Sequence, residues 1–296
     1  MRALIQSFRP RTLPLSLSSV AVGVFLAMHG GCFSLPVTLW LAVTTLCLQV
    51  LANLANEWGD WHKGTDCRQT GREALGLQSG RLSERTIIRA IGVTAVMAAG
   101  AGLFLLWTSF GSLRETGFWV FLALGVVSLA AAIYYTIGRR PYGYRGLGDL
   151  AVFFFFGWVG VCGSEYLLTH RMDWGGLLPA SAIGFLITAV LNVNNIRDID
   201  NDRRSGKITF AVWWCTRFAQ CAERPAKWYQ TCLVAAAYAC AAVFACLRQD
   251  FLYFLLSLPV AAVHLYLLWK SKGAAVDRSF KWMVACTFLF ALSYLF

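Results

Sequence analysis

Charged residues are scarce in this sequence. They make up 14% of its 296 residues, and only 15 residues are acidic, whereas about a quarter of an ordinary soluble domain is charged. Hydrophobic residues reach 58%. A chain with this composition is not expected to fold as a soluble globular domain.

Two other kinds of motif are absent. The ten cysteines include no C-x-x-C pair and no cluster with histidine at zinc-binding spacing, so we expect neither disulfides nor structural zinc. No G-x-x-x-x-G-K-[ST] loop occurs, which argues against a nucleoside triphosphate as phosphate donor.

The sequence does contain many apolar runs, and a helix needs about 20 such residues to cross a bilayer. We therefore predict an all-α polytopic membrane protein, a single domain over 1–296 with about nine transmembrane helices. The predicted spans are 12–30, 34–56, 85–107, 117–137, 148–168, 175–197, 228–247, 250–269 and 279–296.

The net charge of +11 reflects topology rather than nucleic-acid binding. With nine spans, 23 of the 26 lysines and arginines fall in the N-terminus and the alternate loops on one side of the membrane. Only Arg114, Arg171 and Arg248 lie on the other side. This bias is the positive-inside pattern, so the basic loops are expected in the cytoplasm and the protein in the inner (cytoplasmic) membrane.

Two polar segments share one spacing. Asn53, Asn56, Asp60 and Gly64 follow the second span, and Asn195, Asp198, Asp202 and Gly206 follow the sixth, with gaps of three, four and four residues in each set. Matching residues are 142 positions apart, which predicts two pseudo-repeat halves at about 1–140 and 141–296. Internal repeats with sites at their interface are common in membrane proteins.

These spacings place each set on one helical face. An acidic side chain at mid-membrane costs roughly 2.5–3.5 kcal/mol, so the carboxylates are expected to line an aqueous cavity or to bind cations. Hard oxygen ligands suit Mg²⁺, which is usually shared with substrate phosphates. With Lys63 and Lys207 nearby, two facing columns could enclose a diphosphate; the simpler alternative is that they are solvated helix ends.

Both motifs resemble those of the UbiA superfamily of intramembrane aromatic prenyltransferases. The likeness extends over nearly the whole chain, through FRPRTLPLS at 8–16, NLANEWGDWHKGTD at 53–66, LQSGRLS at 77–83 and LNVNNIRDIDNDRRSGKITFAV at 191–212. The stretch RPYGYRGLGDLAVFFFFG at 140–157 points to the naphthoate branch.

The resemblance implies a nine-helix bundle with the two acidic motifs under a cytoplasmic cap and a lipid-facing portal. The implied reaction transfers a polyprenyl group from polyprenyl diphosphate to 1,4-dihydroxy-2-naphthoate, with loss of CO₂ and diphosphate, in menaquinone biosynthesis. Mg²⁺ is the implied cofactor. Prenyl length, oligomeric state and the base that removes the acceptor proton stay open.

Site residues follow from the motifs and the resemblance together. The candidate Mg²⁺-diphosphate ligands are Asn56, Asp60, Asp198 and Asp202, of which the three aspartates are the catalytic candidates. The candidate substrate-binding residues are Asn53, Lys63, Asp66, Arg72, Tyr135, Arg139, Tyr142, Arg145, Asn195 and Lys207. Glu57 stands where the family usually has aspartate, which leaves its metal role in question.

The region 140–149 is the candidate for acceptor specificity. Its glycines let backbone approach a flat ring, its tyrosines can stack, and Arg145 can pair with an acceptor carboxylate. The alternative is ordinary turn chemistry at a span boundary. Other functions also stay open: a different aromatic acceptor, a secondary transporter that uses intramembrane acids, or a CDP-alcohol phosphotransferase, although its D-G-x-x-A-R element is absent.

Overall fold

Helices form all the named secondary structure elements in the residues that the computed structural model describes, which are 2–69, 72–218, 223–249 and 252–296. The α-helices are α1 (Arg2–Ser7), α2 (Leu13–His29), α3 (Leu35–His62), α4 (Glu84–Phe110), α5 (Thr116–Tyr134), α6 (Gly148–Val152), α7 (Gly163–Thr169), α8 (Leu177–Arg197), α9 (Ile199–Arg204), α10 (Phe210–Phe218), α11 (Arg224–Arg248), α12 (Leu258–Lys270) and α13 (Asp277–Leu292). Between α6 and α7 the chain continues as a π-helix, η4 (Phe153–Cys162). The predicted all-α fold is confirmed.

Eight helical segments in the described ranges are long and apolar enough to cross a membrane. They are Arg2–His29, Leu35–His62, Glu84–Phe110, Thr116–Tyr134, Gly148–Thr169, Trp174–Arg197, Arg224–Arg248 and Tyr253–Lys270. They match the first eight predicted spans, except that 250 and 251 lie outside the described residues. The ninth span corresponds to α13, whose 16 residues are short of the usual length for crossing a bilayer. The estimate of about nine spans therefore agrees with the structure.

Several helix ends follow local sequence signals. Proline occupies the first turn of α2, α3, α11 and α12, where its missing N–H breaks no helical hydrogen bond. The Ser83 hydroxyl caps α4 by accepting from the Thr86 amide at 3.3 Å. Gly111 ends α4 in the left-handed region at φ 64°, a conformation that glycine adopts without steric strain.

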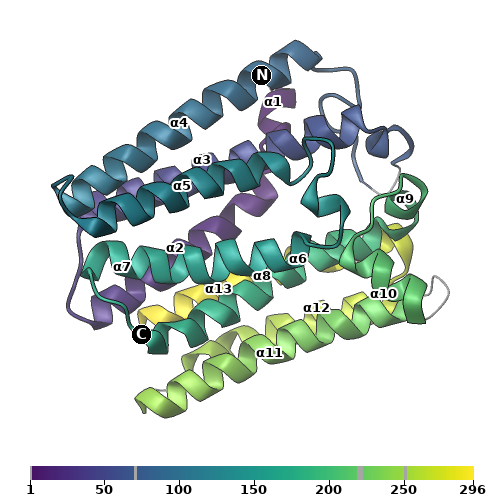
Figure 1. Cartoon of the computed structure of the whole chain (residues 1–296). Coiled ribbons are helices and arrows are strands. Elements are labelled where there is room, and N and C mark those ends of the chain that lie inside the picture. Colours follow the sequence, from purple (N-terminus) through teal and green to yellow (C-terminus); the bar gives the residue numbers. More distant parts are fainter. Residues whose placement is uncertain (1, 70–71, 219–222, 250–251) are drawn as a thin grey trace.

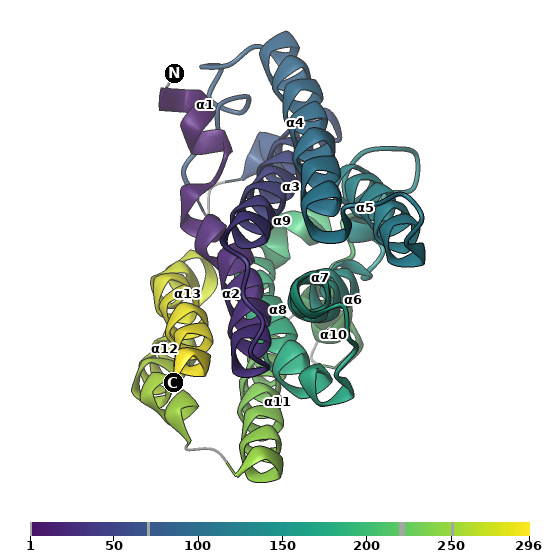
Figure 2. The same ribbon diagram turned by 90° about the vertical axis from the view of Figure 1, so that its left-hand side faces the viewer.

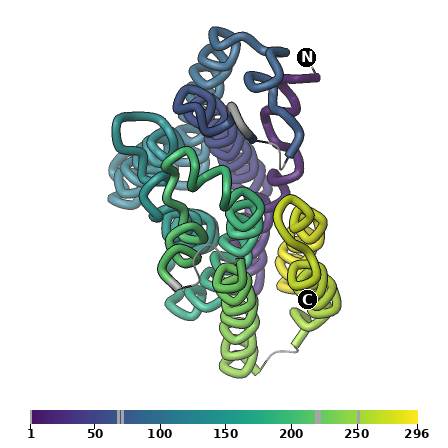
Figure 3. Tube along the Cα trace, turned by 90° about the vertical axis from the view of Figure 1, so that its right-hand side faces the viewer, coloured from purple at the N-terminus to yellow at the C-terminus, as the bar shows by residue number. Residues whose placement is uncertain are grey.

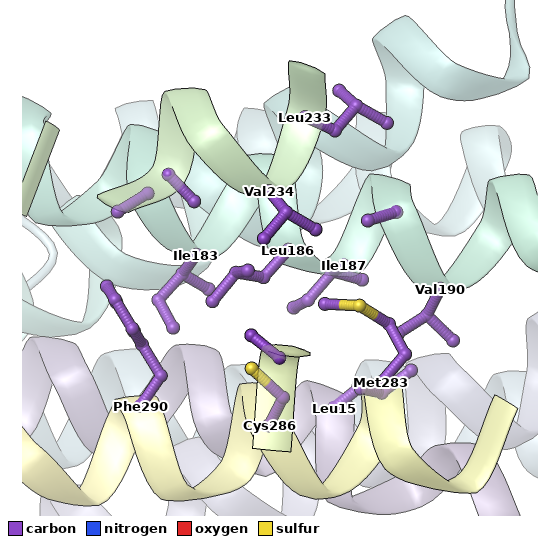
Figure 4. Close-up of a cluster of buried hydrophobic side chains, with 14 of the residues drawn as sticks. Leu15, Ile183, Leu186, Ile187, Val190, Leu233, Val234, Met283, Cys286 and Phe290 are labelled. Carbon is purple, nitrogen blue, oxygen red and sulfur yellow. The ribbon is translucent and has the colours of Figure 1, made fainter. Parts of the chain in front are cut away.

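The hydrophobic core centres on α8. Ile183, Leu186 and Val190 of this helix are buried against Val234 of α11 and Met283 of α13. Figure 4 shows these side chains meeting between the two neighbouring helices. Because α8 packs on several sides at once, it provides a rigid support for the polar segment at its C-terminal end.

Figure 1 shows the long helices running side by side, and Figure 2 shows α2 near the middle of the bundle. Helix α2 contacts α3 and α13 as well as α7, η4 and α8. The C-terminal helices α12 and α13 pack together on one flank, and α4 and α5 pack against α3 on another. This arrangement leaves space among α2, α3, α4, α5, η4 and α8, where the cavity described below lies.

The two polar segments lie at the same end of the bundle, which we call the polar end. Here α3 is followed by the short helix η2 (Thr65–Arg68), and α8 is followed by α9, which contacts η2. Figure 3 views the molecule from this side, where the connecting segments cross over the helix ends. The motifs predicted to face each other are therefore neighbours in space.

Topology provides a first test. Arg81 and Arg114 are exposed arginines that flank α4 at its two ends. In a background in which all ten native cysteines are replaced by serine, Arg81→Cys is expected to react with a membrane-impermeant maleimide only from the cytoplasmic side. Arg114→Cys should react only from outside, because basic loops are retained in the cytoplasm. Labelling in the reverse sense would refute the predicted orientation.

Candidate active site

Direct hydrogen bonds join the first and second acidic motifs. The Lys207 ammonium contacts both carboxylate oxygens of Asp60, at 3.3 and 3.2 Å, although the two residues are 147 positions apart. The Asn201 amide donates to the Thr65 carbonyl oxygen at 3.0 Å. The end of α3 and the segment after α8 therefore form one polar site.

Asp60 connects the end of α3 to two other segments of the chain. It is 8% exposed and accepts a 2.7 Å hydrogen bond from the Tyr144 hydroxyl, in addition to its ion pair with Lys207. The ammonium of Lys207 also lies over the Tyr144 ring, 5.2 Å from its centroid. Burial alone would lower the pKa of Lys207, but Asp60 and Asp202 raise it above its usual value, so this lysine is charged.

The second motif contains two carboxylates in different environments. Asp198 pairs with Arg197 through oxygens at 2.7 and 2.8 Å, and despite burial this pair lowers the pKa of Asp198. Asp202 is 4% exposed. Its burial, together with repulsion from Asp198 and Asp60, raises its pKa to about 7 even though Lys207 opposes the shift.

A fourth carboxylate belongs to η2. Asp66 is buried and pairs with Arg72 at 2.7 Å through its Oδ1 atom, while its Oδ2 atom has no hydrogen-bond partner. Burial raises the pKa of Asp66, with Asp60 adding to the effect and Arg72 opposing it. For both Asp66 and Asp202, burial raises the pKa by more than the nearby cations lower it.

A large cavity opens beside the polar site. Its volume is about 550 Å³. The polar residues that line it include Arg9, Asn53, Asn56, Tyr135, Tyr142 and Asn194. Beyond these it is lined mainly by apolar side chains of α2–α5 and η4, among them Phe155 and Phe156. The run of four phenylalanines thus contributes two rings to the cavity, whereas Phe154 is exposed.

The predicted asparagines have partners within the protein. The Asn53 amide donates to the Phe8 carbonyl oxygen at 2.9 Å, Asn56 accepts from the Thr136 hydroxyl at 3.3 Å, and Asn195 donates to Asp149 at 3.5 Å. Asn53 and Asn56 also line the cavity. Their predicted contacts with substrate or metal stay predictions.

Four basic residues lie outside the cavity. Lys63, Arg139, Arg140 and Arg145 are exposed and, with Pro141 and Tyr144, surround a separate surface hollow. Tyr135 and Tyr142 lie on the cavity side of this segment, and the Tyr142 hydroxyl donates to the Ala131 carbonyl oxygen at 2.7 Å. Tyr135 and Tyr142 therefore line the cavity, whereas Arg139 and Arg145 line the surface hollow.

A family model for the UbiA prenyltransferase family matches residues 16–292. The chain belongs to this family. The 1,4-dihydroxy-2-naphthoate octaprenyltransferase of Escherichia coli (strain K12) is 42% identical over 243 residues, which cover 82% of this chain and 76% of that protein. The predicted family resemblance is therefore confirmed.

Solved UbiA structures share the fold. A UbiA homolog from Aeropyrum pernix K1 aligns with a TM-score of 0.70 at 18% identity, over 95% of this chain and 96% of that chain. A UbiA homolog from Archaeoglobus fulgidus, solved with DMAPP and Mg²⁺, aligns with a TM-score of 0.61 at 13% identity, over 99% and 98% of the two chains.

The acidic residues of this UbiA protein fit a shared Mg²⁺ site rather than a closed one. In the described part of the chain no three His, Cys, Asp or Glu side chains gather closely enough to hold a metal by themselves. Asp60 and Asp198 are each paired with a cation, while Asp66 Oδ2 has no partner. Mg²⁺ commonly binds through one or two carboxylates plus substrate phosphates, and this donor set matches that pattern.

Glu57 has a different position from the motif aspartates. It is fully buried in α3, and its Oε1 atom accepts a 2.9 Å hydrogen bond from the Leu77 amide. Its carboxylate therefore anchors the segment that leads into α4, and the same contact accounts for the LQSGRLS stretch lying close to the motif.

Two residues have positions that local sequence patterns did not indicate. Tyr144 was one of two tyrosines in the proposed acceptor region, but its hydroxyl bonds Asp60. Arg9 was part of the family resemblance in FRPRTLPLS, yet it lines the cavity. The position of Arg9 after the first helix did not indicate a role in binding, because local residue spacing does not show which cavity or surface its side chain reaches.

Proposed function

We propose that this protein transfers a polyprenyl group from polyprenyl diphosphate to 1,4-dihydroxy-2-naphthoate, with loss of CO₂ and diphosphate, in menaquinone biosynthesis. The observation that carries the proposal is the contact between the two acidic motifs, in which the Lys207 ammonium binds the Asp60 carboxylate. This contact lies beside a mainly apolar cavity of about 550 Å³. The name of the 42% identical Escherichia coli relative supports this acceptor.

The polar site would bind the diphosphate. Asp60, Asp198 and Asp202, with Asn56, would share Mg²⁺ with the phosphate oxygens of the substrate. The bound Mg²⁺ would neutralise charge on the diphosphate leaving group. Lys207 and Arg72 supply positive charge from the protein. Preorganised charge of this kind, directed at the group where negative charge develops, is usually the largest catalytic contribution.

The cavity would bind the apolar parts of both substrates. Its aliphatic and aromatic walls exclude water from the allylic carbon as the C–O bond to diphosphate breaks. The rings of Phe155 and Phe156 face the cavity, and aromatic faces attract cations. The electron-rich ring of the acceptor then forms the new C–C bond.

One assay tests the proposal against its alternatives. The purified protein in lipid nanodiscs is given Mg²⁺, a polyprenyl diphosphate and, in separate reactions, 1,4-dihydroxy-2-naphthoate, 4-hydroxybenzoate or homogentisate. Mass spectrometry is expected to detect a prenylated, decarboxylated naphthalene product. A product only from another acceptor would refute the acceptor assignment, and no product from any acceptor would refute prenyl transfer.

A further inference from the structure

Arg9 has an unusual backbone conformation at the edge of the cavity. It precedes the short 3₁₀ helix η1 (Pro10–Thr12) and adopts φ 52° and ψ 65°, in the left-handed region. Residues other than glycine rarely adopt this conformation, and where they do the strain is often sustained for a functional reason. In this conformation Arg9 is one of the residues that line the cavity.

Helix α3 holds this turn in place. The Asn53 amide donates to the Phe8 carbonyl oxygen at 2.9 Å and to the Thr12 hydroxyl at 3.4 Å. The Thr12 backbone amide and hydroxyl both donate to the Arg9 carbonyl oxygen, each at 2.9 Å. The backbone on both sides of Arg9 is therefore clamped against the start of the first acidic motif.

The Arg9 guanidinium has no fixed partner. Charged groups near enough to act on it include Arg72, Asp60 and Asp66, but in the described part of the chain no hydrogen bond or ion pair to its side chain is formed. The neighbouring cations differ, since Lys207 pairs with Asp60 and Arg72 with Asp66. The donors of Arg9 thus stay available to a ligand.

Arg9 is also the one lysine or arginine among the described residues that line the cavity. Arg11, two positions later, points elsewhere: its side chain is 64% exposed, pairs with Asp277 at 3.4 Å and lies over the Phe280 ring. Arg145, the cation that the sequence favoured for the acceptor, is exposed and lines the separate hollow.

We propose that Arg9 binds the carboxylate of the aromatic acceptor and so selects acidic acceptors, an inference that rests on the proposed prenyl transfer. An aromatic acid offers one planar carboxylate and one apolar ring. A guanidinium binds a carboxylate through two parallel hydrogen bonds, while the ring enters the apolar part of the cavity. The prenyl diphosphate carries more charge and matches the Mg²⁺ site with Lys207 and Arg72.

The test compares two acceptors that differ only in the carboxylate. Wild-type protein and Arg9→Gln are assayed under reducing conditions with 1,4-dihydroxy-2-naphthoate and with 1,4-dihydroxynaphthalene. Wild type is expected to prefer the acid in kcat/KM, and Arg9→Gln to lose about tenfold to a hundredfold of that preference, as for a lost charge-assisted hydrogen bond. The KM for the prenyl diphosphate should stay within about twofold in the variant, because the proposal gives Arg9 no contact with that substrate.

Two further variants separate binding from folding. Arg9→Gly relieves the left-handed backbone, so it is expected to keep or raise the melting temperature while losing the acid preference to the same extent. Arg11→Gln, from the same segment, should keep the wild-type preference. A purely structural role for Arg9 would instead lower both the melting temperature and the activity on both acceptors equally.

The outcomes distinguish this inference from the proposed function. If wild type prenylates the naphthoate and Arg9→Gln retains its preference for the acid, the assignment of Arg9 is refuted while prenyl transfer stands. A rise in the KM for prenyl diphosphate alone would move Arg9 to the diphosphate site and also refute the proposal. If wild type prenylates neither naphthalene, the proposed function itself fails.

Discussion

Asp60→Asn and Asp198→Asn are each expected to lower prenyl transfer by about a hundredfold or more, while Asp200→Asn leaves it nearly unchanged. Removal of one preorganised charged or polar group at a reacting centre typically costs about 10²–10³ in kcat. Asparagine keeps the shape of each side chain and removes only the charge. The two motifs should be affected comparably, because both would act on one leaving group.

The structure supplies the matched control for this comparison. Asp200 lies in α9 between Asp198 and Asp202 but is exposed, whereas Asp202 is 4% exposed. Near-normal turnover of Asp60→Asn or Asp198→Asn would show that the substituted aspartate does not take part in prenyl transfer. Thermal unfolding in detergent checks that each variant is folded, since Asp60→Asn leaves Lys207 without its ionic partner.

Much of the fold was predictable because span length is a strong physical constraint. Apolar runs of about 20 residues gave the eight long helices, and a shared spacing of three, four and four gave the two motifs at helix ends. These signals are local, so they need no knowledge of tertiary packing. Apolar composition does not predict the burial of α8, because the Trp174–Arg197 segment is 72% buried while the equally apolar Thr116–Tyr134 segment is 6% buried.

The partners of the polar groups were less predictable. Spacing places Asp60 on a helical face, but its bonds to Tyr144 and Lys207 cross 84 and 147 residues. Likewise, Arg9 and Arg145 are both arginines beside glycine- or proline-containing turns, and only the tertiary structure shows that Arg9 lines the cavity. The π-helical stretch η4 had no distinguishing signal in its phenylalanine run.

Metal removal is expected to abolish prenyl transfer. Treatment with EDTA should reduce turnover to the background of a no-enzyme reaction, and excess Mg²⁺ should restore it, because the diphosphate leaving group would otherwise depart with its charge uncompensated. Full activity after exhaustive chelation, verified by elemental analysis, would contradict the proposed role of the carboxylates.

The arrangement of those carboxylates also predicts how the metal binds. Asp60 and Asp198 are tied to Lys207 and Arg197, so the protein alone should bind a divalent cation weakly, and the phosphate oxygens of the substrate should complete the site. Binding of Mn²⁺, used as a paramagnetic substitute for Mg²⁺ and measured by electron paramagnetic resonance, should therefore tighten by about tenfold or more when an unreactive prenyl thiodiphosphate is added. By linkage, Mn²⁺ must tighten binding of the thiodiphosphate by the same factor. Asp202→Asn should weaken this coupling and Asp200→Asn should not; tight Mn²⁺ binding that ignores the thiodiphosphate would instead indicate a closed metal site formed by the protein alone.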